Sequence, residues 1–288
     1  MALEATVYER IPPVDAAAVR KNIEEITRGV TVSGVARRAL ELASNPDTSL
    51  LEIGAFISRD PELATRVLKT INSVIYGFPR RISSVNQALL LLGLNAVRGV
   101  LWNLTVFDLM KNTMVGLWEH SAGCAIVSRL IAKRKGFKDP EDASLYGLLH
   151  DMGKTIFALR WPKLYAQALS DAKTTDAPIR DMETVHFNVT HAIAGAWLAG
   201  QWSFPTTLVE VIKYHHAPQR AKEGRRETAI AHVADIIVRA RGFGFAGDIY
   251  VPAVDPGAWE LLGLSDGDLR DILSEMEDLM EEAEALTV

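Results

Sequence analysis

Apolar residues recur at helical spacing along most of this chain, and helix-capping or helix-breaking residues separate one such segment from the next. Residues 60–62 (Asp-Pro-Glu) are an example. An N-cap aspartate precedes a first-turn proline and an acidic first turn, and Leu63, Val67 and Ile71 then share one helical face. Runs of β-branched residues are short, and aromatic residues make up only 7% of the chain. This pattern predicts an all-α fold.

Composition and charge exclude several classes of protein. The single cysteine, Cys124, rules out an internal disulfide framework and a cysteine-rich zinc site. The N-terminus is charged where a signal peptide would be apolar, and no apolar run is long enough to span a membrane, so we expect a cytoplasmic protein without a membrane segment. Residues 265–288 contribute −8 to the net charge of −5, which leaves +3 for the rest. Neither value suggests a nucleic-acid partner.

The chain has seven histidines, and one of them stands beside an aspartate in the sequence LLHDMGK. His150 and Asp151 end a predicted apolar helix, where two adjacent side chains diverge by about 100° but can still converge on a metal ion near the helix end. Lys154 follows about one turn later, and its positive charge suits a phosphate group. Taken alone, a His-Asp pair is more simply a surface or capping pair.

Further candidate ligands lie on four other predicted helices. His120 begins one helix, His191 precedes a glycine by four residues so that another helix can pass closely, and His215 and His216 end a third. Asp235 interrupts an apolar face, where a carboxylate is costly unless it is paired or bound to a metal. Five histidines and two aspartates on five predicted helices together indicate one metal-binding centre.

Three other residues have simpler interpretations. We expect Cys124, one turn after His120, to be a buried apolar residue rather than a ligand. We expect His186 to be exposed. His232 lies three residues before Asp235, and the sequence leaves open whether it supports the centre or lies on the surface.

The order of these residues, H…HD…HxxxGAxL…HH…AD, resembles the HD superfamily of metal-dependent phosphohydrolases. Within it, the chain is most similar to the branch that contains the HD-GYP cyclic-di-GMP phosphodiesterases and the HDOD proteins. The N-terminal half carries the HDOD pattern DP-x-L-x-x-x-x-L-x-x-x-N-S followed by I-x-S-x-x-x-A-x-x-x-L-G, and WSFPTTLVEVIKYHHAP is also HDOD-like. The resemblance covers about residues 15–240.

This resemblance implies a division of the chain and a set of ligands. It implies an N-terminal helical lobe over residues 13–112 and an HD-like metal-binding helical lobe over residues 113–245, followed by a loop and an acidic C-terminal helix over residues 246–288. The metal-ligand positions of the family fall on His120, His150, Asp151, His191, His215, His216 and Asp235. Nitrogen and carboxylate ligands suit one or two divalent transition-metal ions, which would be iron, manganese, zinc or nickel.

The sequence also departs from the HD-GYP pattern. After His216 the chain reads APQRAKEGRRE, which lacks the acidic residue and the G-Y-P signature that follow the double histidine in those hydrolases. Gly116 stands where some of them carry an additional acidic ligand. The sequence therefore predicts metal binding but gives no support to cyclic-di-GMP hydrolysis.

Two functions of different classes remain open. The HDOD resemblance implies a bacterial signal-transduction or regulatory protein that contacts a signalling protein partner. The alternative is a metal-dependent phosphohydrolase acting on a phosphorylated small molecule, either a nucleotide or a phosphodiester. In that case the catalytic residues would be Asp151, which would bridge two ions that activate water, and Lys154, which would neutralise charge on the phosphate.

Overall fold

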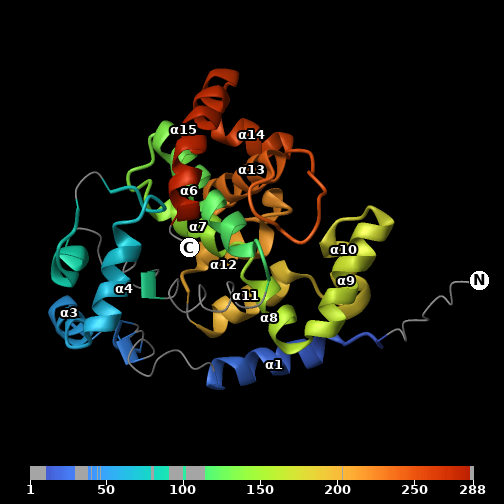
Figure 1. Cartoon of the computed structure of the whole chain (residues 1–288), viewed down its shortest axis with the longest axis horizontal. Coiled ribbons are helices and arrows are strands. Elements are labelled where there is room, and N and C mark those ends of the chain that lie inside the picture. Colours follow the sequence, from blue (N-terminus) through green and yellow to red (C-terminus); the bar gives the residue numbers. More distant parts are fainter. Residues whose placement is uncertain are drawn as a thin grey trace, which may run out of the picture.

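Helices connected by loops and turns make up the described part of this chain. The computed structural model describes residues 11–29, 38–39, 41–43, 45, 47–78, 81–90, 100–101, 114–202 and 204–285, and no strand occurs among them. The predicted all-α fold is therefore confirmed, and Figure 1 shows how the helices are arranged. Among these residues, no helix combines the length and the apolarity that are needed to cross a membrane.

Capping residues start two of the N-terminal helices, including the helix that the sequence predicts after Asp60. The described N-terminal helices are α1 (Ala16–Gly29), α3 (Leu50–Ser58) and α4 (Pro61–Ile71). Ser49 and Glu52 form a reciprocal capping box at the start of α3. The Asp60 carboxylate accepts a hydrogen bond of 2.9 Å from the Leu63 N–H at the start of α4. These caps satisfy backbone donors that a helix start would otherwise leave unpaired.

The helix α6 (Leu117–Arg134) occupies the middle of the fold. It is buried along nearly its whole length, and it packs against α7 (Asp142–Leu149), α13 (Arg225–Arg241) and α15 (Asp266–Ala285). Its contact with α7 is very close, because a Cβ atom on Gly147 would lie 2.2 Å from the Cys124 carbonyl oxygen. Only glycine permits this approach.

Five further helices follow α7 along the chain. They are α8 (Gly153–Arg160), α9 (Pro162–Thr175), α10 (Ile179–Phe187), α11 (His191–Gln201) and α12 (Thr206–Tyr214). The sequence pattern predicts one helix over residues 183–200, and this prediction is wrong. Asn188 adopts a left-handed conformation with φ 52° and ends α10, which asparagine tolerates better than most residues. The pattern over residues 160–180 is mixed, yet most of this segment forms α9.

The C-terminal helices pack onto the rest of the chain. The short helix α14 (Pro256–Leu262) precedes α15, which buries Ile272 and Met276. The acidic side of α15 pairs with basic residues at the end of α6, for example Lys135 with Asp268 at 2.6 Å. The predicted acidic C-terminal helix is therefore held against α6 by apolar and ionic contacts.

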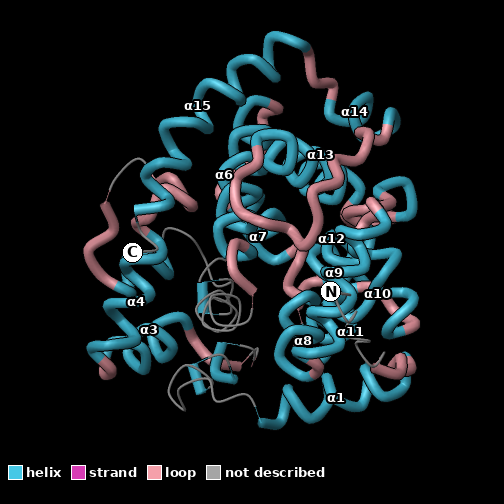
Figure 2. The backbone as a smooth tube through the Cα atoms, turned by 45° about the vertical axis from the view of Figure 1, so that its right-hand side comes forward, coloured by secondary structure: helices cyan, strands magenta, loops and turns pink. Residues whose placement is uncertain are grey.

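The N-terminal helices share their core with later parts of the chain. Helix α1 lies against α11, as Figures 1 and 2 show. One apolar cluster contains Val19 and Ile71 together with Phe157 and Leu198. The predicted lobe boundary between residues 112 and 113 lies outside the described residues, so the division into lobes stays a prediction.

Candidate metal centre

The structure brings all seven predicted ligands together where α6, α7 and α13 meet α11 and α12. The residues are His120 in the first turn of α6, His150 and Asp151 after α7, His191 at the start of α11, His215 and His216 after α12, and Asp235 in α13. His216 is half-buried, and each of the others is at most 1% exposed. Most of the ligands therefore stand at helix ends, where segments distant in sequence can converge.

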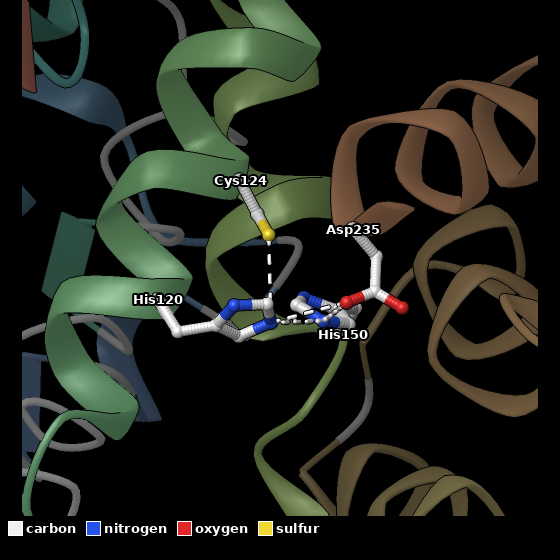
Figure 3. Close-up of side chains that lie close together, drawn as sticks. All are labelled: His120, Cys124, His150 and Asp235. Carbon is white, nitrogen blue, oxygen red and sulfur yellow. Dashed lines mark hydrogen bonds and ion pairs between the residues drawn. The ribbon is translucent and has the colours of Figure 1, made fainter. Parts of the chain in front are cut away.

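The candidate donor atoms form two groups. His120, Cys124, His150 and Asp235 make up the first group, shown in Figure 3. Asp151, His191, His215 and His216 make up the second group. Within each group, all donor atoms lie within 4.8 Å of one another. Such spacing allows four side chains to bind a single ion.

Asp151 lies between the two groups. Its Oδ2 atom is 3.3 Å from His150 Nε2 and 3.5 Å from His120 Nε2. Its Oδ1 atom is 3.1 Å from His191 Nε2 and 3.6 Å from His215 Nε2. Oδ1 is buried and has no hydrogen-bond donor among the described residues. A buried carboxylate oxygen without a donor is costly, and a cation at this position would remove that cost.

The histidine rings are held so that their Nε2 atoms face inward. The Nδ1–H groups of His150 and His215 donate to the carbonyl oxygens of Gly147 at 2.6 Å and Ile212 at 2.8 Å. In its neutral form each of these two rings carries its one N–H group at Nδ1, so its Nε2 atom presents a lone pair. The Nε2 atoms of His191 and His216 are only 3.0 Å apart. The donor set therefore fits a metal ion that these lone pairs would share.

The electrostatics of the centre also favour a cation. Burial alone would raise the pKa of Asp151, but the adjacent His150 and Lys154 hold it well below its usual range. Burial would likewise raise the pKa of Asp235, and Arg239 keeps it low. Two ionised carboxylates are therefore enclosed here. Burial would lower the pKa of His150, but the Asp151 carboxylate raises it to about 9, so a metal ion that binds His150 would displace a proton from this ring.

At His191 the Glu183 carboxylate outweighs burial and raises the pKa, whereas burial keeps three other histidines of the centre neutral. Burial lowers the pKa of His120 to about 4. The pKa values of His215 and His216 lie well below their ordinary value, because of burial and, after it, the neighbouring imidazoles. Neutral imidazole is the form that binds metal ions.

Sequence reasoning missed Glu183, which orients His191. Glu183 is fully buried, and its Oε2 atom accepts hydrogen bonds from the His191 backbone N–H at 2.8 Å and from Nδ1–H at 2.6 Å. The Tyr165 hydroxyl donates to Oε1 at 3.1 Å. A carboxylate behind a histidine fixes the ring and increases its basicity. The break at Asn188 is the sequence signal that could have revealed this contact.

Two histidines outside the ligand set are buried. His232 links His215 to the loop before α14, because its Nδ1–H donates to the His215 carbonyl oxygen at 2.7 Å and its Nε2 accepts the Asp255 N–H at 2.9 Å. It therefore supports the centre, which is one of the two alternatives that the sequence left open. His186 is only 6% exposed and pairs with Asp171 at 2.8 Å, so the prediction that it is exposed is wrong.

Two buried cations accompany the carboxylates. The Lys154 ammonium contacts Asp151 Oδ2, and Lys154 is fully buried. The Nε atom of Arg239 lies 2.7 Å from Asp235 Oδ1, and its Nη1 atom lies 2.9 Å from Asp248 Oδ1. Both cations offset negative charge that would otherwise be enclosed without a partner.

A close contact between α8 and α11 sets the position of His191. A Cβ atom on Gly153 would lie 1.9 Å from the His191 carbonyl oxygen, and one on Gly195 would lie 3.1 Å from the Gly153 nitrogen. The expected close approach at Gly195 is therefore confirmed. This contact brings His191 next to the residues that follow α7.

One small cavity reaches the centre from outside, next to His216. Its lining residues are Pro178, Ile179, Arg180, His216, Arg239, Asp248, Tyr250 and Pro252, and its volume is about 10 Å³. A space of this size holds about one water molecule.

The described helices bring the residues of the order H…HD…H…HH…D together in one centre, and this arrangement defines a helical protein of the HD type. Comparison with known proteins gives the family: the HDOD domain family model matches residues 30–218, so this chain belongs to the HDOD domain family.

Solved structures share this fold. An HDOD domain protein of unknown function from Geobacter sulfurreducens is 27% identical, with a TM-score of 0.68, and the match covers 93% of this chain and 97% of that one. A candidate signal transduction protein from Marinobacter aquaeolei VT8 is 18% identical, with a TM-score of 0.69 and coverage of 94% and 65%. At that identity the likeness shows the fold alone.

A curated relative matches part of its own length. It is an uncharacterized protein from Treponema pallidum (strain Nichols), 27% identical over 212 residues, which are 72% of this chain and 41% of that protein. The chain therefore spans about two fifths of that relative.

Proposed function

We propose that this chain is a signal-transduction protein whose buried metal centre reports metal occupancy to its N-terminal helices and, through them, to a signalling protein partner. The observation that carries this proposal is the enclosure of the centre. Six of the seven candidate ligands are at most 1% exposed, and the cavity beside His216 has a volume of about 10 Å³. Sites for small molecules are typically about 300–1,000 Å³. The geometry thus favours an ion that is held in place over a substrate that enters and leaves.

Two structural connections support transmission from the centre to the N-terminal helices. His191 is the first residue of α11, and α11 packs on α1. On the other side, Arg129 of α6 donates to the Val74 carbonyl oxygen at 3.3 Å, and the Ser144 hydroxyl donates to the Ile75 carbonyl oxygen at 2.9 Å. A bound ion would supply positive charge and fixed coordination to the ends of α6, α7 and α11.

Hydrogen exchange and a hydrolysis screen test this proposal on the full chain. We expect the purified protein to contain one or two transition-metal ions, and we expect chelation to speed amide exchange in α1 and in residues 72–78. We expect no hydrolysis of nucleotides, cyclic dinucleotides or simple phosphodiesters by the metal-loaded protein. Metal-dependent hydrolysis that disappears in Asp151→Asn would overturn the proposal, as would identical exchange with and without metal.

A metal-dependent phosphohydrolase is the second candidate, and the two-sided position of Asp151 favours it. Its Oδ1 and Oδ2 atoms face different groups of histidines, as a carboxylate that bridges two ions does. Lys154 would have to leave Asp151 Oδ2 to contact a phosphate. For such an enzyme, Asp151→Ala should abolish hydrolysis and lower metal content together. Lys154→Ala should reduce turnover while the metal stays bound.

A further inference from the structure

Cys124 belongs geometrically to the first group of donor atoms. It lies on α6 one turn after His120 and is fully buried. Its sulfur points toward the His120 ring, with Sγ 3.6 Å from His120 Nε2 (Figure 3). The side chains of His150 and Asp235 complete the group around it. The sequence alone predicts a buried apolar residue here, and the burial is confirmed.

The separations within this group match those between ligands of one tetrahedral ion. With metal–sulfur bonds of about 2.3 Å and metal–nitrogen bonds of about 2.0–2.1 Å, tetrahedral angles put sulfur and nitrogen about 3.6 Å apart and two nitrogens about 3.4 Å apart. The observed distances are 3.6 Å from Cys124 Sγ to His120 Nε2 and 3.4 Å between the Nε2 atoms of His120 and His150. Asp235 Oδ1 lies 3.2 Å from His120 Nε2 and 3.8 Å from His150 Nε2, so one distance is shorter and one is longer than the 3.4 Å between the two nitrogens.

Two carboxylate oxygens lie near the first group, and a basic side chain contacts each of them. The Lys154 ammonium contacts Asp151 Oδ2, and Arg239 Nε lies 2.7 Å from Asp235 Oδ1. Asp151 Oδ1 instead faces the second group, where it joins three histidines. The two groups therefore differ in chemistry: the second group offers only nitrogen and oxygen, and the first group also offers sulfur.

We propose that Cys124 is a metal ligand, so that His120, Cys124, His150 and Asp235 hold one ion and this ion is zinc. A thiolate with two imidazoles and a carboxylate in tetrahedral arrangement selects zinc over the harder manganese and magnesium. The second group can hold a different ion. This inference rests on the metal centre of the proposed function, and it adds the identity of the ion at one of the two groups. The competing arrangement is a thiol whose S–H donates to His120 Nε2 and binds no metal.

X-ray absorption at the zinc edge tests the inference on the intact, zinc-loaded chain. Because Cys124 is the only cysteine, a thiolate signal has only one source. We expect a sulfur scatterer at about 2.3 Å in the wild type and its absence in Cys124→Ser. Cobalt-loaded wild type should likewise show a thiolate-to-cobalt charge-transfer band that Cys124→Ser lacks.

Zinc titration provides a second measurement with a matched control. Cys124→Ser should bind zinc more weakly at one site and normally at the other. The loss should exceed the roughly 10- to 100-fold effect of removing a group that only supports a ligand. Ser128→Ala, a buried change one turn later on α6, should leave zinc binding unchanged.

The outcomes separate this inference from the metal centre itself. If the wild type binds zinc without a sulfur scatterer, and Cys124→Ser binds it equally well, Cys124 is not a ligand and the metal centre stands without it. If the wild type binds no transition metal, the metal centre fails and this inference fails with it.

Discussion

Replacing Glu183 by glutamine should weaken metal binding while the fold stays intact. The Glu183 carboxylate accepts both His191 donors at one oxygen and the Tyr165 hydroxyl at the other. Glutamine can reproduce this geometry, because its carbonyl oxygen can accept from His191 while its amide group donates to the Tyr165 oxygen. The negative charge behind the His191 ring is what the substitution removes.

The size of the effect follows from these bonds. Hydrogen bonds to charged groups contribute about 1.5–3 kcal/mol, against about 0.5–1.5 kcal/mol for neutral ones, so Glu183→Gln should lower the free energy of unfolding by about 1–3 kcal/mol. The loss of basicity at His191 should weaken metal binding about 10- to 100-fold. Glu183→Ala leaves three buried donors without an acceptor, at about 1–3 kcal/mol each, and should destabilise the protein severely.

Metal titration and thermal melting of the same samples measure the two effects separately. Tyr165→Phe is the matched control, because it removes one hydrogen bond of Glu183 and leaves the charge and both His191 contacts. It should lower stability slightly and leave metal affinity unchanged. If Glu183→Gln binds metal as tightly as the wild type, Glu183 only stabilises the fold, and the argument for its influence on His191 is refuted.

Three further predictions concern packing, pH and cooperativity. Gly153→Ala should lower the melting temperature and the metal content, because its Cβ would lie 1.9 Å from the His191 carbonyl oxygen. The control is Gly200→Ala on α11, whose Cβ would have no neighbouring atom within 4 Å, and it should stabilise the helix by about 0.5–1 kcal/mol. The free energy of unfolding of the metal-free protein should fall as the pH drops from 6.5 toward 4, because His120, His215 and His216 bind protons in the unfolded chain but not in the folded protein. His120 alone, with its pKa near 4, accounts for about 3 kcal/mol. A free energy of unfolding that does not change over this pH range would contradict the reasoning. Calorimetry of the full chain should show one unfolding transition, because the apolar core is shared between the N-terminal helices and the later ones, and two separate transitions would show that the parts fold independently.

Local sequence signals predicted much of this fold. The capping box at Ser49 and the N-cap at Asp60 fix helix starts through backbone contacts that depend on a few neighbouring residues. The seven candidate ligands were also predictable, because a carboxylate or a histidine within an apolar helix needs a partner wherever the chain places it. The spacing could not show that the ligands divide into two groups with Asp151 between them, which depends on how the helix ends meet.

The missed features depend on tertiary contacts or on a single backbone angle. One left-handed residue, Asn188, turns a predicted continuous helix into α10 and α11, and this break places Glu183 beside His191. The burial of Cys124 was predicted, but its closeness to His150 and Asp235 was not, because these two residues come from other helical regions than α6. His186 is buried by a partner fifteen residues away, Asp171, which periodicity does not reveal.

The candidate ligands join parts of the chain that lie far apart in sequence, and an ion bound among them would act as a reversible cross-link. His120 and His150 are 30 residues apart, and His191 and His215 are 24 apart. In the chain-entropy treatment of cross-links, closing a loop of either length destabilises the unfolded state by about 3–4 kcal/mol. A chain with one cysteine has no internal disulfide to serve this purpose. Its resistance to unfolding would then follow the supply of metal rather than the redox state of its surroundings.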